Sequence, residues 1–596
     1  RNTVSAEMVN VSNGNNQNSI KEIGAINNLA LSNLTQVGMG VSVGIAAGEK
    51  SKLAGMAAVT VNKVEDRVLS HVDNLTAYAQ SLSVQAEDGV LEQDEAVNTY
   101  VTNLKSSGID ADGSEAMRIY GKSADVDFAV DFDKEKPDSF DESGNLKTED
   151  VYKTGDFNFK NKGNTIVGMA VSVAVKTAKD GAAAGVGVSH GSFDNTFDTQ
   201  VKNSEIHLFD TSDKLHVGAE ADSSIGNVAV GTAVKLGEGK SLALAGSGAK
   251  SVMTNNTNAR VQNTDIYANN TEIKAKNDST LVSIAGTANV NLGEGWGAGG
   301  LSYAGNRLNN TTGAYMEGVT VDAFNGSSSV DVKSINDSGI YALSFAGAVG
   351  KSNYVAAEGA FAGNAGTNNT IARVEHLELD KANAKYRDNY IYNADKINVN
   401  ANTKLTERTV AMMGSVNAFG QNNYLSLGST VAKNIVGKAD NKQQVEASLN
   451  NTDITTKITT TTGKEENADI LVKAKNDNSI LALSIGGAAR IGGKSLGLTA
   501  TASAAKTEIY ADNIAEQVNT SIDNEESAKD KAKKAIVKTT AKNDARIGSS
   551  ADSFSVDTSK LSLAAVGAGS HVKIKSNTDA LVEGGVQNVA DAEVNS

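Results

Sequence analysis

Apolar or small residues alternate with polar residues at a period of two through most of the chain. In the run from Ser241 to Ala249, Leu242 and Leu244 fall on one face, and Ala243 and Ala245 fall on the other. No stripe at i, i+3, i+4 fits this run, so the pattern predicts a strand rather than a helix. Many runs of this kind, rich in Ala, Gly, Ser, Val and Asn, predict an all-β chain.

The alternating runs also recur at a regular interval. The sequence AKND stands at 275–278 and again at 474–477, and each copy leads into a strand of small residues; a diverged copy reads IND at 335–337. Recurrence at a fixed period is typical of solenoids. The equivalent positions are Gly163, Asp222, Asp278, Asp337, Asp477 and Asp544. With one degenerate copy near Asn402 counted between Asp337 and Asp477, their spacing gives a unit of about 56–74 residues.

Strands of this composition cannot bury an apolar face alone, so each must stack on the equivalent strand of the next coil. We expect each unit to divide into three coils of about 20 residues, which together form a rod on the order of 100 Å long. The predicted fold is a right-handed parallel β-helix with short helical and loop insertions. Because the strands are rich in Ala, Gly and Ser, we also expect a core of small side chains in which the walls approach closely in places.

The recurring Asn-Asp pairs are interpreted as corners of the solenoid. Asparagine tolerates the left-handed backbone region, and its amide can bond to the same residue one coil along. The alternative is ligand or calcium binding, although the calcium-binding repeat GGxGxD does not occur. The residues assigned this turn and ladder role are Asn277, Asp278, Asn336, Asp337, Asn476, Asp477, Asn543 and Asp544.

Three stretches interrupt the repeat, and function is most expected there. The first, 88–158, starts with a predicted helix at 91–108 and continues into an acidic segment around the single proline, Pro137. A Thr-rich excursion follows at 441–467, and a short charged helix is predicted at 523–540. The predicted organisation is therefore a β-helix start at 1–87, an acidic insertion at 88–158 and a repeated β-helix at 159–596.

Composition adds constraints on location and partners. The 596 residues include one proline and no cysteine, so no disulfide or thiolate metal site can form. Cysteine exclusion also fits a chain that crosses an oxidising compartment unfolded. A net charge of −15 opposes binding to nucleic acid, and no apolar run reaches the length of a membrane-spanning helix. Because the repeat is running near both ends, the chain is interpreted as a piece of a longer protein.

No catalytic constellation is evident, so we expect a protein that is not an enzyme and that needs no cofactor or metal. HExxH, GxSxG and Walker motifs do not occur. His207 and His216, with Asp210 and Asp213 between them, have two interpretations, a metal pair or ordinary surface residues. A carboxylate cluster contributed by three coils, as in a β-helical polysaccharide lyase or hydrolase, is the main alternative to the non-catalytic prediction.

Aromatic residues concentrate in the middle of the chain, most densely in AKYRDNYIY at 384–392. One interpretation is packing along the strand ladder. The other is a face that contacts protein or sugar, because exposed Tyr, Trp and Arg are favoured contact residues. The candidate interaction residues are Tyr386, Arg387, Tyr390, Tyr392 and Trp296.

The AKND and IND turns, with the strands SIAGTANV, ALSFAGAV and ALSIGGAA that follow them, resemble the large exoproteins of Gram-negative bacteria. The resemblance is to type V passenger domains and, in particular, to leukotoxin-like filamentous adhesins exported by two-partner secretion. It covers most of residues 160–590. No functional residue is carried over, because the family has no catalytic motif to match.

The resemblance implies an extracellular or cell-surface protein that leaves the cell through an outer-membrane translocator. Its expected partner is a protein or glycan receptor on a host or bacterial cell, and neither nucleic acid nor a transmembrane segment is expected. The leading functional prediction is an adhesin or exotoxin rod that acts by contact. The alternatives are the β-helical lyase or hydrolase and the delivery stalk of a larger leukotoxin.

Overall fold

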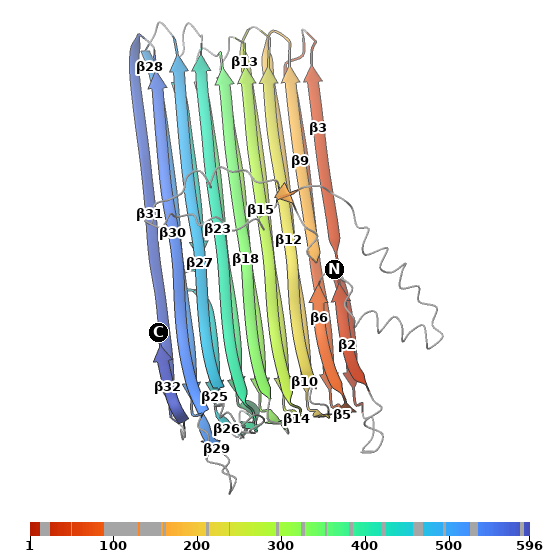
Figure 1. Ribbon diagram of the computed structural model, residues 1–596. Coiled ribbons are helices and arrows are strands. Elements are labelled where there is room, and N and C mark those ends of the chain that lie inside the picture. The colour runs from red at the N-terminus through yellow and green to blue at the C-terminus, as the bar shows by residue number, and fades with distance from the viewer. Residues whose placement is uncertain are drawn as a thin grey trace, which may run out of the picture.

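The computed structural model consists of long parallel strands wound into a solenoid (Figure 1). No helix occurs in the part of the chain that it describes, and hence none there that is long and apolar enough to cross a membrane. The described residues are 1–11, 24–48, 50–88, 129–130, 157–158, 163–209, 214–237, 239–293, 297–323, 328–351, 355–380, 385–418, 425–456, 469–492, 496–524, 535–558, 560–584 and 589–596.

The strands form three sheets, which we call the front, back and end sheets, and a regular coil such as β12–β13–β14 crosses all three in turn. The front sheet contains β2 (Ala25–Ser32), β3 (Thr35–Ala46), β6 (Ser81–Asp88), β9 (Asn164–Lys176), β12 (Lys214–Lys235), β15 (Asn270–Asn291), β18 (Ser329–Gly350), β23 (Lys396–Ala418), β27 (Asp469–Ile491), β30 (Ala535–Asp557) and β32 (Val589–Asn595). The back sheet contains β1 (Asn2–Val9), β4 (Leu53–Asp73), β10 (Gly181–Lys202), β13 (Ser241–Gln262), β16 (Gly297–Glu317), β19 (Val355–Glu375), β24 (Leu425–Val436), β25 (Gln443–Asn450), β28 (Leu496–Val518) and β31 (Leu561–Glu583).

The end sheet is narrow and closes one side of the solenoid. It contains β5 (Thr76–Ala79), β11 (Glu205–Leu208), β14 (Asp265–Tyr267), β17 (Thr320–Asp322), β22 (Asn389–Tyr392), β26 (Thr452–Thr456) and β29 (Ser521–Asn524). On the opposite side, which we call the turn edge, front strands pass directly into back strands. Two antiparallel pairs lie outside the three sheets: β7 (Ala129–Val130) with β8 (Phe157–Asn158), and β20 (Leu377–Asp380) with β21 (Lys385–Arg387).

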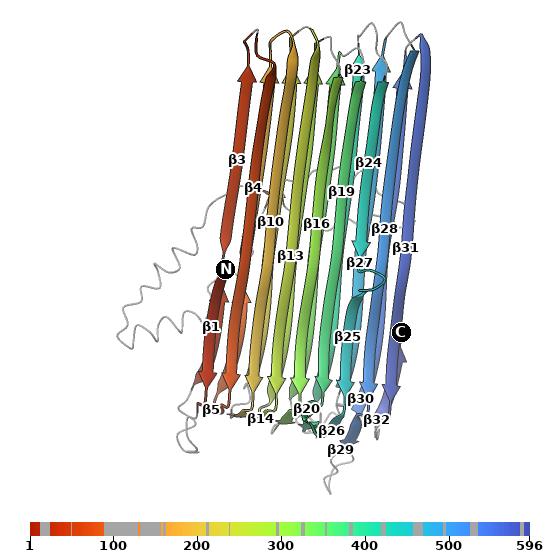
Figure 2. The same ribbon diagram turned by 180° about the vertical axis from the view of Figure 1, so that it is seen from behind.

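The winding is right-handed. In Figure 1 the front strands run upward, the back strands behind them run downward, and successive coils advance from right to left. Figure 2 shows the same course from behind, with the back strands nearest the viewer and running downward. The predicted right-handed parallel β-helix is therefore confirmed.

The size of the coil differs from the prediction. Asp222 of β12 pairs directly with Asp278 of β15, so one repeat of 56 residues makes one coil rather than three. Each long strand of about 22 residues spans about 70 Å, whereas nine stacked levels span only about 40 Å. The molecule is thus a slab that is longer along its strands than along its stack, and the expected 100 Å rod was wrong.

The repeat alignment read from the sequence is confirmed in detail, but the role of its motif is not. Asp222, Asp278 and Asp337 pair in register, followed by Lys404, Asp477 and Asp544. These positions lie in the middle of front strands, so the assignment of turns to Asn277, Asp278, Asn336, Asp337, Asn476, Asp477, Asn543 and Asp544 was wrong. In AKND the alternation continues unbroken: the Asn side chain points into the core and the Asp side chain points outward.

The true corners between back and end sheets use other asparagines. Six of them have a positive φ between 47° and 56°: Asn10, Asn74, Asn203, Asn263, Asn451 and Asn519. They stand in one column, and amides of successive coils bond to one another, as from Asn263 Nδ2 to Asn203 Oδ1 at 2.8 Å. A following hydroxyl closes the corner, as when Thr264 Oγ1 donates to the Gln262 carbonyl at 2.8 Å. The predicted corner chemistry is correct, although it belongs to this column.

The left-handed conformation of the corner asparagines leads to a prediction about the unfolding free energy. Replacing Asn263 by alanine removes two side-chain hydrogen bonds but keeps a Cβ in the left-handed region at φ 47°, whereas glycine removes the same bonds together with the Cβ. We expect Asn263→Ala to lower the unfolding free energy by about 1 kcal/mol more than Asn263→Gly does. Urea unfolding midpoints of the two variants measure the difference. Equal midpoints would contradict a role for backbone strain at this corner.

The interior is layered along the strands. Next to the end sheet, Val, Ile, Leu and Ala side chains from all three sheets form the largest apolar cluster. A seam of amides follows, in which Asn255 of the back sheet donates to Asn277 and Ser279 of the front sheet at 3.2 and 3.0 Å. Beyond a layer of Ile, Leu, Phe and Met lies a second seam, which runs without a break through Ser189, Asn227, Ser251, Ser283, Asn306, Asn364 and Thr409.

Toward the turn edge the core narrows to alanine, glycine and serine, as predicted. A Cβ added at Gly231 would lie 2.1 Å from the Gly246 carbonyl oxygen of the facing sheet. At Gly185 the corresponding distance, to the Thr232 carbonyl oxygen, is 2.2 Å. The two sheets approach backbone to backbone here, and only glycine fits between them.

Two of the three predicted interruptions are partly regular coil. The 441–467 stretch supplies β25 and β26 as far as Thr456, and 457–467 lies outside the described residues. The helix predicted at 523–540 is wrong at both ends, where β29 ends at Asn524 and β30 begins at Ala535. The alternating pattern IVKTTAKND at 536–544 places Lys538 and Lys542 on the outer face of β30. The predicted helix at 91–108 and most of 88–158 lie outside the described residues.

Candidate functional site

A hairpin insertion interrupts the corner column in the middle of the stack. In the coil of β19 the corner position is His376, and the chain then makes the β20–β21 hairpin before it enters β22. Gly318 holds the corner position of the preceding coil, with φ +59°, and a Cβ there would lie 2.6 Å from the Leu377 Cβ. Glycine replaces asparagine at this corner because the hairpin fills the space that an amide side chain would need.

Arg387 ties the hairpin to two earlier coils. Its guanidinium donates to the Asp265 carboxylate and to the Asn263 side-chain oxygen, both from the β13–β14 coil. It also reaches Thr320 Oγ1 of β17 at 3.5 Å. Charge-assisted bonds of this kind are the stronger class of side-chain hydrogen bond. The sequence placed Arg387 among surface contact residues, and the structure shows that its first role is to anchor the insertion.

The other side of the hairpin is fixed to the following coil. His376 Nδ1 and Asn451 Nδ2 lie 2.7 Å apart, so the histidine continues the corner column. The Tyr386 ring meets the His376 ring edge-on, with the centroids 4.5 Å apart. Tyr386 is nevertheless 48% exposed. The hairpin therefore presents an aromatic side chain on a base that contacts coils on both sides.

The end sheet carries an aromatic row beside this hairpin. In each short strand the central residue points inward, as Ile206, Ile266 and Ile391 do, so its two neighbours point outward. On successive strands the rings of Tyr78, His207 and Tyr267 stack with centroid distances of 4.6 and 4.3 Å. Tyr390 and Tyr392 continue the outward face on β22, with their rings nearly parallel and their centroids 6.1 Å apart.

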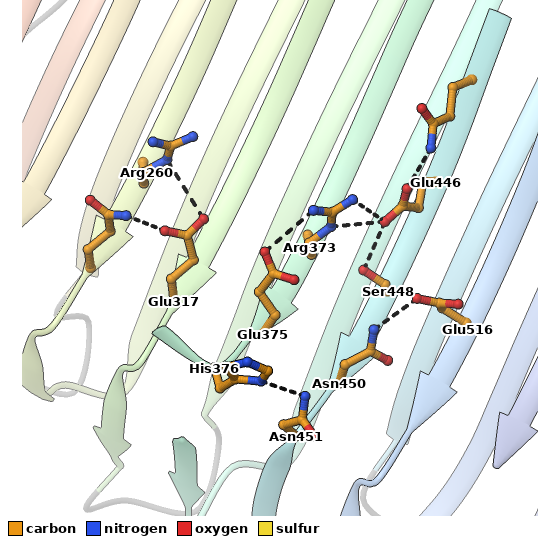
Figure 3. Close-up of polar contacts among 12 residues, drawn as sticks. Arg260, Glu317, Arg373, Glu375, His376, Glu446, Ser448, Asn450, Asn451 and Glu516 are labelled. Atoms are coloured by element: carbon orange, nitrogen blue, oxygen red, sulfur yellow. Dashed lines mark hydrogen bonds and ion pairs between the residues drawn. The ribbon is translucent and has the colours of Figure 1, made fainter. Parts of the chain in front are cut away.

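The outer face of the back sheet adds a charged strip next to the same corner (Figure 3). Arg373 bonds to the Glu446 carboxylate at 2.6 and 2.9 Å and pairs with Glu375 at 3.4 Å. The Arg260 guanidinium lies 4.8 Å from the centroid of the Tyr315 ring, on the neighbouring strand. The charged side chains of this strip pair with one another, so the strip borders the corner without presenting an unpaired charge to a ligand.

Three groups of this face have a raised pKa, and each shift favours the protonated form near neutral pH. Burial, followed by the nearby Tyr390 and the Asp453 and Asp322 carboxylates, raises the pKa of Tyr392. Burial and Asp265 likewise raise the pKa of Tyr267. Burial alone would lower the pKa of Arg373, but the Glu446 and Glu375 carboxylates outweigh this effect, and the pKa is raised. The hydroxyls of Tyr267 and Tyr392 thus remain protonated and available as hydrogen-bond donors.

The structure brings together four of the five candidate interaction residues. Tyr386, Arg387, Tyr390 and Tyr392 all lie on the hairpin or on β22, whereas Trp296 lies outside the described residues. Sequence reasoning missed Gly318, His376 and Asn451, which hold the hairpin in place. The available signal was the corner Asn of the other coils, followed by Ser or Thr at Asn203, Asn263, Asn451 and Asn519, which is replaced in EGVT and in EHLE.

The two histidines considered as a metal pair have separate partners. His207 contacts Glu205 at 2.8 Å on the end sheet, while His216 contacts Glu272 at 3.1 Å on the outer face of the front sheet. Hydrogen bonds from His216 and Lys214 lower the pKa of Glu272 in spite of its burial. Within the described ranges, no group of three or more His, Asp or Glu is placed to hold a metal ion.

Two carboxyl groups with strongly raised pKa lie in the interior, between the sheets. Burial raises the pKa of Glu358 to about 7, against hydrogen bonds from Asn289 at 2.7 Å and Thr287 at 3.5 Å. Burial also raises the pKa of the fully buried Glu407. Glu407 stands between Ile340 and Ile480 in its inward row, and it fits because Gly366 faces it.

Comparison with known proteins does not identify the chain. No protein-family model, no curated protein and no solved structure matches it. The resemblance to leukotoxin-like adhesins therefore remains a prediction based on the repeat motifs.

Proposed function

We propose that this chain is part of a secreted or surface-exposed β-helical adhesin or exotoxin that contacts host or partner cells without catalysis. The observation that carries the proposal is the hairpin and its neighbouring aromatic face, where Tyr386, Tyr390 and Tyr392 lie together over anchored coils. We call this set of residues the tyrosine face. The proposed partner is a protein or glycan receptor, and the proposed location is the cell surface or the medium.

The rigidity of the tyrosine face supports a role in contact. Arg387 and His376 attach the hairpin to coils on both sides, so little backbone ordering is needed on binding. Tyrosine supplies a large contact area together with a hydroxyl, which suits both protein surfaces and sugar rings. The acidic chain, at −15, also favours specific contact over electrostatic adhesion to anionic cell surfaces.

Loss of the tyrosine face is expected to reduce cell binding by at least about tenfold, the typical effect of removing contact hot spots. The test measures binding of labelled protein to a panel of epithelial, immune and bacterial cells, and compares wild type with Tyr386→Ala/Tyr390→Ala/Tyr392→Ala. The matched control is Phe345→Ala, which removes a 39% exposed aromatic ring from the front sheet. Unchanged thermal midpoints would confirm that the coils remain folded in both variants.

Two outcomes would contradict the proposal. The first is an intact protein that binds no cell type in the panel. The second is equal binding by the triple variant and the Phe345→Ala control, which would place any contact elsewhere on the molecule. Release of reducing ends from a polysaccharide panel by the purified chain would instead support the lyase or hydrolase alternative.

A further inference from the structure

The outer face of the back sheet is uncharged over its half next to the turn edge. Four consecutive outward rows cross the seven strands from β4 to β28, beginning at Leu53, Gly55, Ala57 and Val59. These 28 described positions contain no charged residue, and Ser429 and Tyr303 carry their only hydroxyls. We call this surface the apolar band.

Large side chains in the apolar band are well exposed even in the middle of the stack. Leu301 is 63% exposed, Tyr303 49% and Leu244 45%. They lie on β13 and β16, which have paired neighbours on both sides, so their exposure is not an effect of the ends of the sheet. Charged residues begin only in the next row toward the end sheet, at Lys250 and Lys433.

The interior behind the apolar band is lined by small and polar side chains. There, Ser302 accepts hydrogen bonds from Ser247 and Ser344, at 3.1 and 2.9 Å, and the remaining side chains are mostly Ala and Gly. Apart from Met56 and Met413, the large apolar residues of this half of the solenoid thus face outward. A sheet that carries most of its larger apolar side chains on its outer face buries them only when another surface covers that face.

We propose that the apolar band is an interface with a second copy of this chain, packed face to face. Four rows about 6.7 Å apart on seven strands about 4.8 Å apart cover about 900 Å² on each copy. Burial of about 1,800 Å² in total is the size of a standard stable interface, whereas a typical monomer exposes an apolar patch of about 300–600 Å².

The composition of the band favours a copy of itself as the partner. Large and small residues are mixed within the band, and Leu301 lies between Gly246 and Gly359, so large side chains of one copy can enter the hollows over the glycines of the other. Each chain carries a net charge of −15, and the band keeps those charges out of the contact. Two-fold pairing of identical surfaces is the commonest way in which oligomers close.

Sedimentation velocity of the whole chain tests the interface. Wild type is expected to sediment as a dimer at micromolar concentration, and Leu301→Lys as a monomer, because the new ammonium group would be buried without a partner. The matched control is Val349→Lys, which places the same charge at a 46% exposed position on the outer face of the front sheet and should leave the dimer intact. Far-UV circular dichroism confirms that both variants are folded.

Thiol labelling supplies a second measurement, because the chain has no cysteine of its own. Maleimide should modify Tyr303→Cys at least tenfold more slowly at micromolar than at nanomolar protein, while Val349→Cys reacts at the same rate at both concentrations. A wild type that sediments as a monomer would overturn the proposal, whatever the labelling rate of the thiol at position 303. Dissociation by Val349→Lys with no effect of Leu301→Lys would overturn it as well.

Discussion

Replacing Gly231 by valine is expected to prevent the chain from reaching its compact fold. A Cβ at this position would lie 2.1 Å from the Gly246 carbonyl oxygen and 2.9 Å from that of Gly185. Both contacts are to backbone, which cannot rotate away, so the two sheets would have to separate along several coils. Overpacking of an ordinary core costs about 1–3 kcal/mol, and here the obstacle is rigid backbone instead of flexible side chains. Soluble yield and the thermal unfolding midpoint measure the effect.

The matched control is Gly414→Val, on the outer face of the front sheet. A Cβ added at Gly414 meets nothing within 4 Å, and valine favours extended backbone. We expect this variant to unfold within a few degrees of wild type. Equal behaviour of the two variants would show that the sheets are not in close contact at Gly231.

Stability is expected to fall as the pH rises from 5 to 8. The pKa of Glu358 is about 7 in the folded chain, whereas that of an ordinary glutamate is about 4.3. Between these values the unfolded chain releases a proton that the folded chain keeps, so the free energy of unfolding falls by about 3 kcal/mol. Burial also raises the pKa of Glu407 and of Asp88, and both groups extend the fall in the same direction.

Other groups act in the opposite direction or outside this range. Burial, followed by the charge of Lys250, lowers the pKa of His190, so this residue reduces stability somewhat below about pH 6.5. The pKa of Glu272 is lowered, and its contribution is therefore lost only below about pH 4.3. Neither effect removes the predicted decline above pH 6.5.

Urea unfolding midpoints at pH 5 and pH 8 measure the decline. Glu358→Gln should reduce the difference between the two midpoints, and Glu407→Leu should reduce it further while raising the midpoint at pH 8. Leucine matches the Ile340 and Ile480 side chains on either side of Glu407 in its row. Midpoints that rise from pH 5 to pH 8 in wild type would show that these carboxyl groups are ionised in the folded chain.

The sequence was sufficient to predict the repeat alignment because parallel strands pair in register. The positions aligned on Asp222, Asp278 and Asp337 are direct neighbours in the front sheet. The coil size was wrong because the interior contains polar seams. Asn255 and Asn277 are buried and face each other across the core, yet in sequence each resembles a turn residue between short strands. Which amides meet depends on the facing sheet, and local alternation carries no information about that.

The candidate site was predictable in its surface residues but not in its supports. Tyr390 and Tyr392 point outward because they flank the inward Ile391, and side chains alternate between the two faces of a strand. The contact of Arg387 with Asp265 joins residues more than 100 positions apart and depends on the level at which the hairpin leaves the solenoid. The role of Gly318 depends in turn on the position of the hairpin, so no local signal assigns it.

Long strands stacked in register also give the molecule a direction-dependent resistance to force. A load applied along the strands would shear the ladder bonds of a strand of about 22 residues together, whereas a load along the stack would open them one after another. Peeling away one coil of about 60 residues would release about 200 Å of extended chain. The slab would therefore behave as a stiff plate under one load and as a stepwise extensible tether under the other.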